Sequence, residues 1–362
     1  MYASFMQEVV MESSFKKTAV CQFPKDYKPI LNQHDTEKAI KAAKDIFEKE
    51  LSGSLRLSRV TSPLFVEAGS GINDDLNGIE RPVSFPVKNM GEKKMEIVQS
   101  LAKWKRMALA DLGFKPGYGL YTDMNAIRPD DDIDCIHSIY VDQWDWEKVM
   151  SDGQRNLDFL KKTVCTIYDV IRRTAFRLCE FYPQLEDDLP ESITFVHSED
   201  LALEFPSLTP DEREYEAAKR YGAVFVIGIG YGNPPHGGRA PDYDDWSTCV
   251  SDGAGSYHGL NGDIIVWDSV RQRNLELSSM GIRVDRESLL RQLSLKDCES
   301  RKDLYWHSRL LSGDFPQTIG GGIGQSRLCM FLLKKAHIGE VQASVWPKEV
   351  YSDAASHHAH LF

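Results

Sequence analysis

The spacing of apolar residues predicts two long amphipathic helices. The first begins at Asp35 or Thr36, either of which can cap it, and ends near Gly53. The second runs over residues 156–181. In both segments apolar residues recur every three or four positions, which places them on one buried face of a helix. These faces consist of Ala39, Ile40, Ala43, Ile46, Phe47 and Leu51, and of Leu160, Val164, Ile167, Tyr168 and Ile171.

Shorter apolar runs predict a sheet. The expected strands are residues 55–66, 137–146, 193–198, 223–230, 263–268 and 275–284. Only residues 269–274 separate the last two strands, which suits a hairpin, and strands and helices do not alternate regularly. A further helix begins within 324–333. The pattern predicts an α+β fold with an antiparallel sheet.

Neither a repeat nor a linker rich in glycine, proline or serine divides the chain. We therefore expect one catalytic domain over residues 31–362. Residues 1–30 lack clear periodicity and contain Pro24 and Pro29, so they are expected to form a tail or an accessory segment on that domain.

Composition narrows the range of partners. The 362 residues include 43 basic and 54 acidic side chains, a net charge of −11, which opposes binding to nucleic acid or to an anionic membrane. The most apolar run, residues 223–230, is too short to span a bilayer. The seven cysteines are scattered and odd in number, which predicts reduced thiols in a cytoplasmic protein. They are Cys21, Cys135, Cys165, Cys179, Cys249, Cys298 and Cys329.

Two segments carry polar residues that could converge on a site. In YVDQWDW, residues 140–146, the two-residue period places Gln143 and Asp145 on the same face of a strand. A solvated strand face is an equally good interpretation of this alternation. In QSLAKWKR, residues 99–106, a strand leads into a helix that Ser100 can cap, with Lys105 facing the sheet edge. Taken alone, the basic residues of this helix predict a solvated face. They are Lys103, Lys105 and Arg106.

The segment 228–247 combines five glycines and three prolines with the acids Asp242, Asp244 and Asp245. It is interpreted as a mobile lid that binds a cationic group, with an irregular excursion as the alternative.

The predicted strand 275–284 also carries polar residues. A regular strand would place Glu276 and Ser278 on one face and Ser279 on the other, with Arg283 beyond a possible break at Gly281. A glutamate in an apolar strand needs a cation such as Mg²⁺ as a partner. Asp263, at the start of the neighbouring strand, is a second candidate ligand or a turn residue.

The glycine-rich stretch GGGIGQSR covers residues 320–327. It lacks the lysine of a phosphate-binding P-loop. Gly320, Gly322 and Gly324 allow a ligand to approach the backbone closely, and Arg327 falls in the first turn of the following helix. An arginine there can bind a phosphate with two parallel hydrogen bonds or stack on a base.

This stretch resembles motif 3 of the class II aminoacyl-tRNA synthetases. LRLSRVTSPLF (55–65) resembles motif 1, and LYTDMNAIRPDDD (120–132) supplies the motif 2 arginine as Arg128. Together with QSLAKWKR, YVDQWDWE, RAPDYDDWS, GLNGD and ELSSMGIRVD, these stretches make residues 35–350 similar to the ammonia-dependent asparagine synthetases. The resemblance implies a class II synthetase-like antiparallel sheet flanked by helices. Three positions depart from the family pattern, namely Arg56 for a glycine, Gln99 for a histidine and Asp75 for an amide.

The resemblance implies a two-step reaction in the cytoplasm. Aspartate and ATP would give β-aspartyl-AMP and pyrophosphate, and ammonia would then give asparagine and AMP. Among the nearby carboxylates, Asp74 is the expected base for ammonium, and Asp75 is an alternative. We expect a homodimer without nucleic acid or membrane partners.

The resemblance also implies the site residues. The expected catalytic residues are Asp74, Lys105, Arg128, Gln143 and Arg327. The expected aspartate ligands are Asp74, Ser100, Lys105, Gln143, Asp145, Asp244, Ser279 and Arg283. The expected ATP ligands are Arg128, Asp263, Glu276, Gly322, Gly324 and Arg327, of which Glu276 and Asp263 would hold Mg²⁺.

Three other classes are considered. A tRNA synthetase would normally carry a separate anticodon-binding module. This chain has neither the spare length nor the basic charge expected for one. A non-catalytic synthetase-like regulator would be expected to lose Arg128 and Arg327, and both are present. A glutamine-dependent asparagine synthetase would need a cysteine where this chain has Tyr2.

Overall fold

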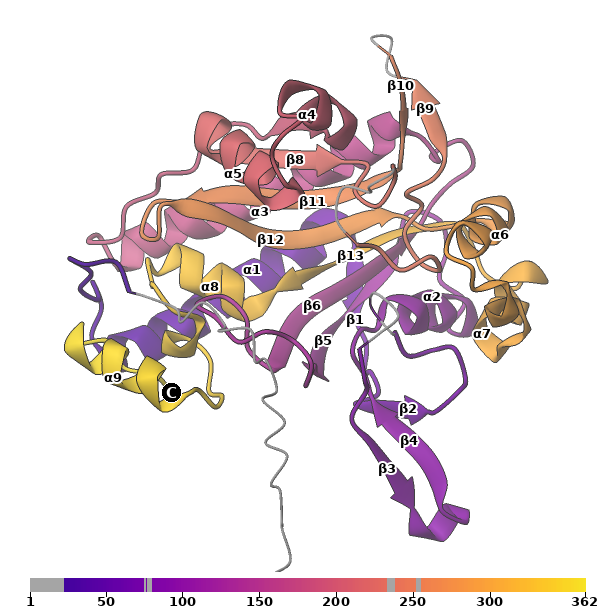
Figure 1. Cartoon of the computed structure of the whole chain (residues 1–362), viewed down its shortest axis with the longest axis horizontal. Helices are drawn as coiled ribbons and strands as arrows, with labels where there is room; N and C mark the ends of the chain where they lie inside the picture. Colours follow the sequence, from indigo (N-terminus) through magenta and orange to yellow (C-terminus); the bar gives the residue numbers. More distant parts are fainter. Residues whose placement is uncertain (1–22, 75, 77–79, 233–237, 252–254) are drawn as a thin grey trace, which may run out of the picture.

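A mixed eight-stranded sheet forms the centre of the molecule (Figure 1). The computed structural model describes residues 23–74, 76, 80–232, 238–251 and 255–362. The strand order is β1-β5-β6-β13-β12-β11-β8-β7. Its strands are β1 (Leu57–Arg59), β5 (Gly119–Ile127), β6 (Tyr140–Val149), β7 (Thr194–His197), β8 (Ala223–Ile227), β11 (Asn261–Asp268), β12 (Arg273–Ile282) and β13 (Thr318–Gly324).

The predicted antiparallel arrangement is confirmed for the six central strands, including the β11–β12 hairpin. It is wrong at both edges, where β1 pairs with β5 and β7 with β8 in parallel. Two helices, α4 (Ser198–Glu204) and α5 (Pro210–Tyr221), connect β7 to β8, and such a crossover is what a parallel pair requires.

The remaining strands form two smaller sheets. Strands β2 (Phe65–Glu67), β3 (Ser84–Val87) and β4 (Lys93–Ile97) form a three-stranded sheet that projects from the body (Figure 1). Strands β9 (Cys249–Ser251) and β10 (Ser256–His258) form a two-stranded sheet. The single strand predicted over 55–66 is therefore wrong, because β1 and β2 belong to different sheets and Pro63 lies between them.

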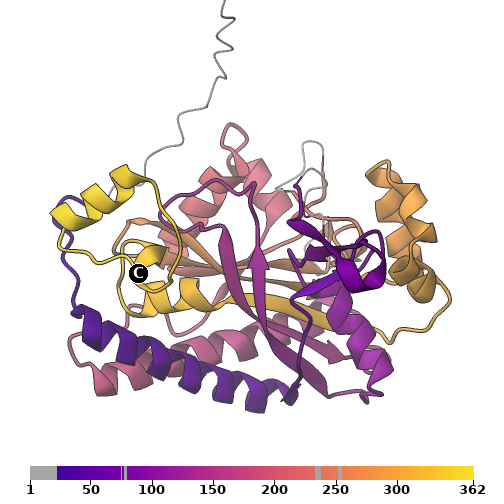
Figure 2. The same ribbon diagram turned by 90° about the horizontal axis from the view of Figure 1, so that it is seen from below.

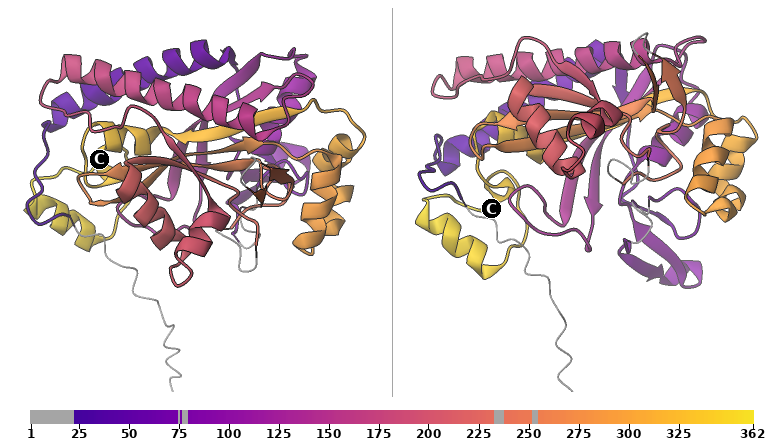
Figure 3. Two further views of the ribbon diagram at one scale, coloured as in Figure 1. Left: turned by 90° about the horizontal axis from the view of Figure 1, so that it is seen from above. Right: turned by 45° about the horizontal axis from the view of Figure 1, so that its top comes forward.

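Helices α1 (Gln33–Leu55) and α3 (Leu157–Phe181) cover one face of the central sheet (Figures 2 and 3). Trp144 of β6 packs against Phe47 of α1 with ring centroids 4.7 Å apart. Both helices confirm the periodicity, but the caps of α1 differ from those expected. Asn32 caps its start, and it ends at Arg56, whose φ of 59° lies in the left-handed region.

The opposite face is covered only in part. Helix α2 (Ala102–Asp111) packs on β5, β6 and β13, and α5 packs on β8, β11 and β12. Polar side chains of β6 and β12 lie between them. The remaining helices are α6 (Arg286–Leu295), α7 (Tyr305–Leu311), α8 (Gln325–Leu332) and α9 (Lys348–Ser356), with 3₁₀ turns η1 (Lys88–Met90), η2 (Glu299–Asp303) and η3 (Ile338–Glu340).

The described part of the N-terminal segment packs on the main domain. Phe23, Tyr27 and Leu31 are buried, and the Tyr27 hydroxyl donates to Glu340 at 2.8 Å. The division at residue 30 stays a prediction. Within the described residues, no helix combines the length and the apolar character needed to cross a membrane.

The cysteines require one correction. Cys135 is disulfide-bonded, so the expectation of seven reduced thiols is wrong for this residue. Five others are free cysteines, namely Cys165, Cys179, Cys249, Cys298 and Cys329, and Cys21 lies outside the described residues.

Candidate active site

A cavity of about 550 Å³ lies where several of the predicted site residues meet. The predicted residues that line it are Arg128, Gln143, Glu276, Ser279, Gly322, Gly324 and Arg327. It is also lined by Arg239 and Tyr243, which the sequence analysis did not single out. Segments from the whole length of the chain therefore converge on one polar hollow, referred to below as the main cavity.

Backbone register sets the floor of the main cavity. Asp145, Gly322, Ser279 and Asp263 are paired in one row across β6, β13, β12 and β11. Directly paired residues point to the same side of a sheet. A Cβ atom on Gly322 would lie 2.9 Å from Asp145 Oδ1 and would also collide with Gln143 Oε1. The missing side chain in β13 thus leaves space for the polar groups of β6.

A buried ion pair lies on the same face of the sheet as this floor. Lys105 Nζ is 3.0 Å from Asp145 Oδ1 and 2.9 Å from the carbonyl oxygen of Gly321. The two side chains are 1% and 4% exposed, so the solvated interpretations of both residues are wrong. Desolvation lowers the pKa of Lys105, although Asp145 acts to raise it. The pair is therefore held against a considerable cost of burial.

The other two basic residues of α2 are also buried. Lys103 Nζ lies 3.2 Å from Asp242, and Arg106 donates to the carbonyl oxygens of Pro316 and Val284. The solvated basic face expected for this helix is consequently wrong. Arg106 fixes α2 to the segments that follow β12 and precede β13, and Lys103 fixes it to the segment between β8 and β9.

Arg283 is the centre of a second buried cluster. Its guanidinium donates to Glu147 at 2.8 Å and, from another nitrogen, to Asp244. Thr318 Oγ1 donates to the same glutamate at 2.6 Å. Burial raises the pKa of Asp244 despite Arg283. Burial acts in the same direction at Glu147, but Arg283 outweighs it and the pKa is lowered. One arginine thus bridges two buried carboxylates from different segments.

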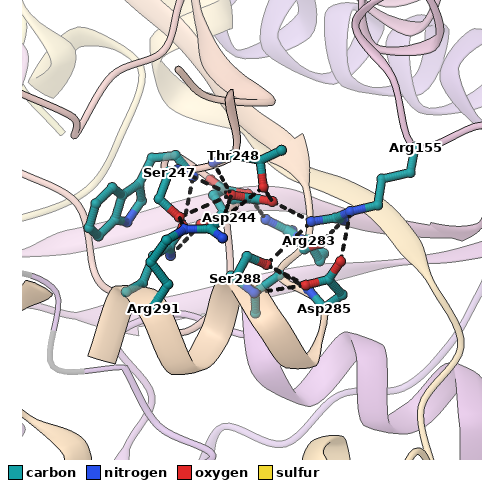
Figure 4. Close-up of polar contacts among 12 residues, drawn as sticks. Arg155, Asp244, Ser247, Thr248, Arg283, Asp285, Ser288 and Arg291 are labelled. Atoms are coloured by element: carbon teal, nitrogen blue, oxygen red, sulfur yellow. Dashed lines mark hydrogen bonds and ion pairs between the residues drawn. The ribbon is translucent and has the colours of Figure 1, made fainter. Parts of the chain in front are cut away.

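The segment that carries the three loop acids is fixed rather than lid-like. Asp242, Asp244 and Asp245 are all buried. Figure 4 shows the contacts that hold this segment to α6, where Arg291 Nε donates to Ser247 Oγ at 3.0 Å. On the other side Arg155 donates to the carbonyl oxygen of Arg283 at 2.7 Å. The lid interpretation is wrong for these acids, and residues 233–237 lie outside the described residues.

Two arginines face the main cavity from opposite segments. Arg128, which follows β5, donates through Nη2 to the carbonyl oxygen of Gln99 at 3.0 Å. Arg327, in the first turn of α8, donates to the carbonyl oxygen of Glu276 at 3.2 Å and lies 3.5 Å from its carboxylate. Desolvation acts to raise the pKa of Glu276, but Arg327 and Arg239 outweigh it and the pKa is lowered. An ionised glutamate therefore lies between cations.

A β-bulge explains why Glu276 and Ser279 share the cavity. The β11–β12 register shifts between Ile264 and Ile265, so that Leu277 is the extra residue in β12. The predicted alternation, with Glu276 and Ser279 on opposite faces, is wrong because the break precedes Ser278 rather than falling at Gly281. Sequence periodicity alone could not locate this bulge.

Asp263 and Glu276 form the pair of carboxylates suggested for Mg²⁺. Burial raises the pKa of Asp263 to about 7, and Glu276 adds to the shift, while Arg239 donates to both oxygens of Asp263. Two mutually repelling carboxylates beside a cavity fit a divalent cation that keeps waters and substrate phosphates as its other ligands. Among the described residues, no group of three or more ligating side chains forms a complete cage.

The remaining predicted residues lie to one side. Asp74 is buried and lines a different cavity, and Ser100 Oγ accepts from the amide of Ala102 at 3.1 Å, in the first turn of α2. Gln99 is buried, and neither of its side-chain polar atoms has a partner in the part of the chain that the structure describes. Asp75 lies outside the described residues.

Two of the residues that sequence reasoning missed had a usable signal. Arg239 lies in the quoted stretch RAPDYDDWS and is the cation that holds Asp263. Glu147 continues the two-residue period of Gln143 and Asp145 along β6. Extending that period by one step would have found it.

Comparisons with known proteins agree with this arrangement. The family model described as aspartate-ammonia ligase matches residues 34–358. A protein of *Parabacteroides distasonis* named aspartate–ammonia ligase is 58% identical over 334 residues, covering 91% of this chain and 96% of the relative. A protein of the same name from *Clostridium perfringens* is 54% identical, with 93% and 98% coverage.

Solved structures with a similar fold are synthetases. Asparaginyl-tRNA synthetase from *Pyrococcus horikoshii*, complexed with asparaginyl-adenylate, superposes with a TM-score of 0.64 at 16% identity, covering 87% of this chain and 72% of that chain. The *Entamoeba histolytica* enzyme gives 0.60 at 14% identity, with 86% and 67% coverage. At these identities the likeness shows the fold alone, and it confirms the predicted class II synthetase-like architecture.

Proposed function

Because the chain belongs to the aspartate-ammonia ligase family, we propose that its main cavity activates aspartate with ATP and then transfers ammonia to it. The chain is a ligase of asparagine biosynthesis and uses ATP. The two-step proposal rests on the distribution of charged and neutral polar side chains around the main cavity. Arg128, Arg239 and Arg327 place three cations in a lining that also holds carboxylates, among them Glu276. Gln143 and Ser279 present neutral polar groups over the glycine floor.

In the first step the β-carboxylate of aspartate attacks the α-phosphorus of ATP. A carboxylate with a reference pKa of about 3.9 is already ionised at neutral pH, so it needs no base. The new bond joins a carboxylate oxygen to phosphorus, and the bond to pyrophosphate breaks. The task of the protein is to bring two anions together, for which Arg128 and Arg327 supply compensating charge. Gly322 and Gly324 let the ligands approach the backbone.

Aspartate is proposed to lie over β6 and β12. Gln143 and Ser279 line the main cavity and can contact it directly. Ser100, Lys105, Asp145, Asp244 and Arg283 stay proposed ligands. The charges of Lys105 and Arg283 are already paired with protein carboxylates, so aspartate must share these partners rather than find free cations.

In the second step ammonia attacks the β-carbonyl carbon of the adenylate and AMP leaves. Ammonium must lose one proton before its lone pair can attack and a second after the C–N bond forms. Asp74 is the proposed acceptor of the first proton. Its charge adds to the raised pKa of Tyr243, a residue of the main cavity, which supports a position near that cavity.

Mg²⁺ is proposed to bind through Glu276, with Asp263 as a second ligand if Arg239 moves. When bound, it would neutralise the charge that develops on pyrophosphate. Glu276→Gln is expected to raise the Mg²⁺ concentration for half-maximal rate by about tenfold, because a neutral amide is a weaker ligand for a hard cation. Glu212→Gln, at the capping box of α5, should leave this requirement unchanged. An unaltered requirement in Glu276→Gln would show that this carboxylate is not a ligand.

A homodimer is proposed through the segment that resembles motif 1. Leu64 and Phe65 of this segment are 52% and 46% exposed, and Phe65 packs edge-on against Phe85. An exposed apolar cluster of this kind suits a protein interface. A cytoplasmic location is proposed from the need of the reaction for ATP.

The test of the proposed function is the pattern of products. With ATP, aspartate and ammonium, purified protein is expected to form asparagine, AMP and pyrophosphate in equal amounts, since the adenylate route cleaves ATP at the α-phosphorus. Replacing ammonium by glutamine or by tRNA tests the other acceptors in parallel. Formation of ADP and phosphate would instead indicate an acyl phosphate and overturn the proposed route.

A further inference from the structure

A second cavity of about 250 Å³ carries, besides Asp74, charged groups that the mechanism above does not use. Its lining includes Asp74, Lys103, Asp242, Arg301 and His307. We infer that this second cavity binds ammonium and supplies it to Asp74. The inference rests on the proposed function and adds to it the place where the nitrogen substrate enters.

One extended segment separates the two cavities. Ala240 and Tyr243 line the main cavity, whereas Asp242, between them, lines the second one. Asp74 also lines the second cavity. Burial raises the pKa of Tyr243, and the charges of Asp74 and Asp242 add to this effect from the far side of the wall. A ligand in the second cavity therefore lies within one layer of protein from the adenylate.

The polar atoms left over in the second cavity are hydrogen-bond acceptors. His307 is fully buried, and its Nε2 donates to Asp242 Oδ2 at 2.9 Å. Its other nitrogen, Nδ1, and Asp242 Oδ1 have no hydrogen-bond partner among the described residues. A Cβ atom on Gly71 would lie 3.0 Å from His307 Nδ1, which places this nitrogen beside a residue that lines the cavity. In the tautomer with its only proton on Nε2, Nδ1 is an acceptor like Asp242 Oδ1, and a ligand that donates hydrogen bonds complements both atoms.

Among ligands that donate hydrogen bonds, the charge of the lining favours a small cation. Four carboxylates, Glu67, Asp74, Glu96 and Asp242, face two permanent cations, Lys103 and Arg301. Ammonium has four N–H donors, no acceptor and a positive charge, and it is small enough for this volume. It can donate to one of these acceptors and reduces the excess of negative charge in the lining at the same time.

His307→Gln tests this inference. A glutamine amide can reproduce the donor that Nε2 offers to Asp242, but it leaves no acceptor at the position of Nδ1. The Michaelis constant for ammonium is expected to rise about tenfold, as for the loss of one hydrogen bond to a charged group. The constants for aspartate and ATP should stay within about twofold, because their ligands lie in the main cavity.

His197→Gln is the matched control. His197 is also buried, but it lies at the end of β7 and lines neither cavity. If circular dichroism shows that His307→Gln is unfolded, Glu96→Gln on the lining strand β4 takes its place, with an expected rise of at least about threefold. An unchanged ammonium constant in the folded variant overturns the inference.

Activity of the wild-type protein with ammonium distinguishes a failure of the proposed function from a failure of the ammonium site. If the unmodified protein forms no asparagine from ammonium, the proposed function itself has failed. If it does, and His307→Gln changes the constants for all three substrates alike, the second cavity is a structural element and the ammonium site is excluded.

Discussion

Asp145→Asn is expected to lower kcat/KM for aspartate by a factor of about 30 to several thousand. Lys105 is fully buried, and Asp145 is the carboxylate that contacts its ammonium group. Asp145 is also the proposed partner of the α-amino group of aspartate, and removing one partner of a desolvated charge pair typically costs about 2 to 5 kcal/mol. The KM for ATP should stay within about threefold, since Arg128 and Arg327 lie on other segments. Steady-state kinetics with each substrate varied in turn measures both effects.

Asp123→Asn is the control for this experiment. Asp123 lies on the neighbouring strand β5 and pairs with Arg59, but it is 35% exposed, and such pairs contribute at most about 1 kcal/mol. If a folded Asp145→Asn variant kept its aspartate kinetics, the buried pair would have no part in substrate recognition. The amino group of aspartate would then have to be bound by Asp74 or Asp244.

Arg327→Lys is expected to lose activity by about 10- to 150-fold although the charge is kept. Arg327 uses several nitrogens at once, toward the carbonyl oxygens of Ile136 and Glu276. A lysine offers one point charge and cannot present a planar fork to a phosphate. The loss of one charge-assisted contact is worth about 1.5 to 3 kcal/mol. The rate of ATP–pyrophosphate exchange in the presence of aspartate measures the adenylation step directly.

Arg309→Lys provides the matched comparison. Arg309 has almost the same exposure as Arg327, 22% against 20%, but it pairs with Asp111 on the surface. Its replacement should leave exchange unchanged. Wild-type exchange in Arg327→Lys would mean that Arg327 only fixes α8 to β12.

The fold could be predicted where the local spacing of apolar residues marks the buried face of an element. Helices α1 and α3 and the β11–β12 hairpin have clear periods and were found. Strand β13 was not predicted, because four of its seven residues are glycines and carry no apolar pattern. The parallel edges depend on contacts between distant segments, such as Leu57 with Gly119, which no local period encodes.

The site was predictable as a set of residues but not as a set of contacts. The motif resemblance supplied Arg128, Gln143, Glu276 and Arg327, which line the main cavity. It did not indicate that the cations of α2 would be buried, because a basic run has the same pattern whether it faces water or buried carboxylates. The tertiary structure decides which carboxylates pair with these cations.

The departure at Arg56 has a physical explanation. Arg56 follows α1 with a φ of 59°, a conformation in which glycine is the favoured residue at a helix end. A glycine at this position in motif 1 is therefore explained by backbone conformation. Arg56 adopts the same conformation at a cost of about 1 kcal/mol and lies over the ring of Tyr118.

The glycines of β13 also bear on how this site could be re-engineered. A Cβ atom on Gly320 would lie 2.7 Å from Arg283 Nη2 and would overlap the carboxylate of Glu147, which passes over β13 to reach Arg283. Strands in a sheet are about 4.8 Å apart and are held there by backbone hydrogen bonds. The backbone thus sets the width of the floor. Because these positions already hold glycine, no smaller residue could enlarge the cavity at β13. A directed-evolution library that seeks a longer acid substrate should keep β13 constant and vary side-chain length on β6 and β12.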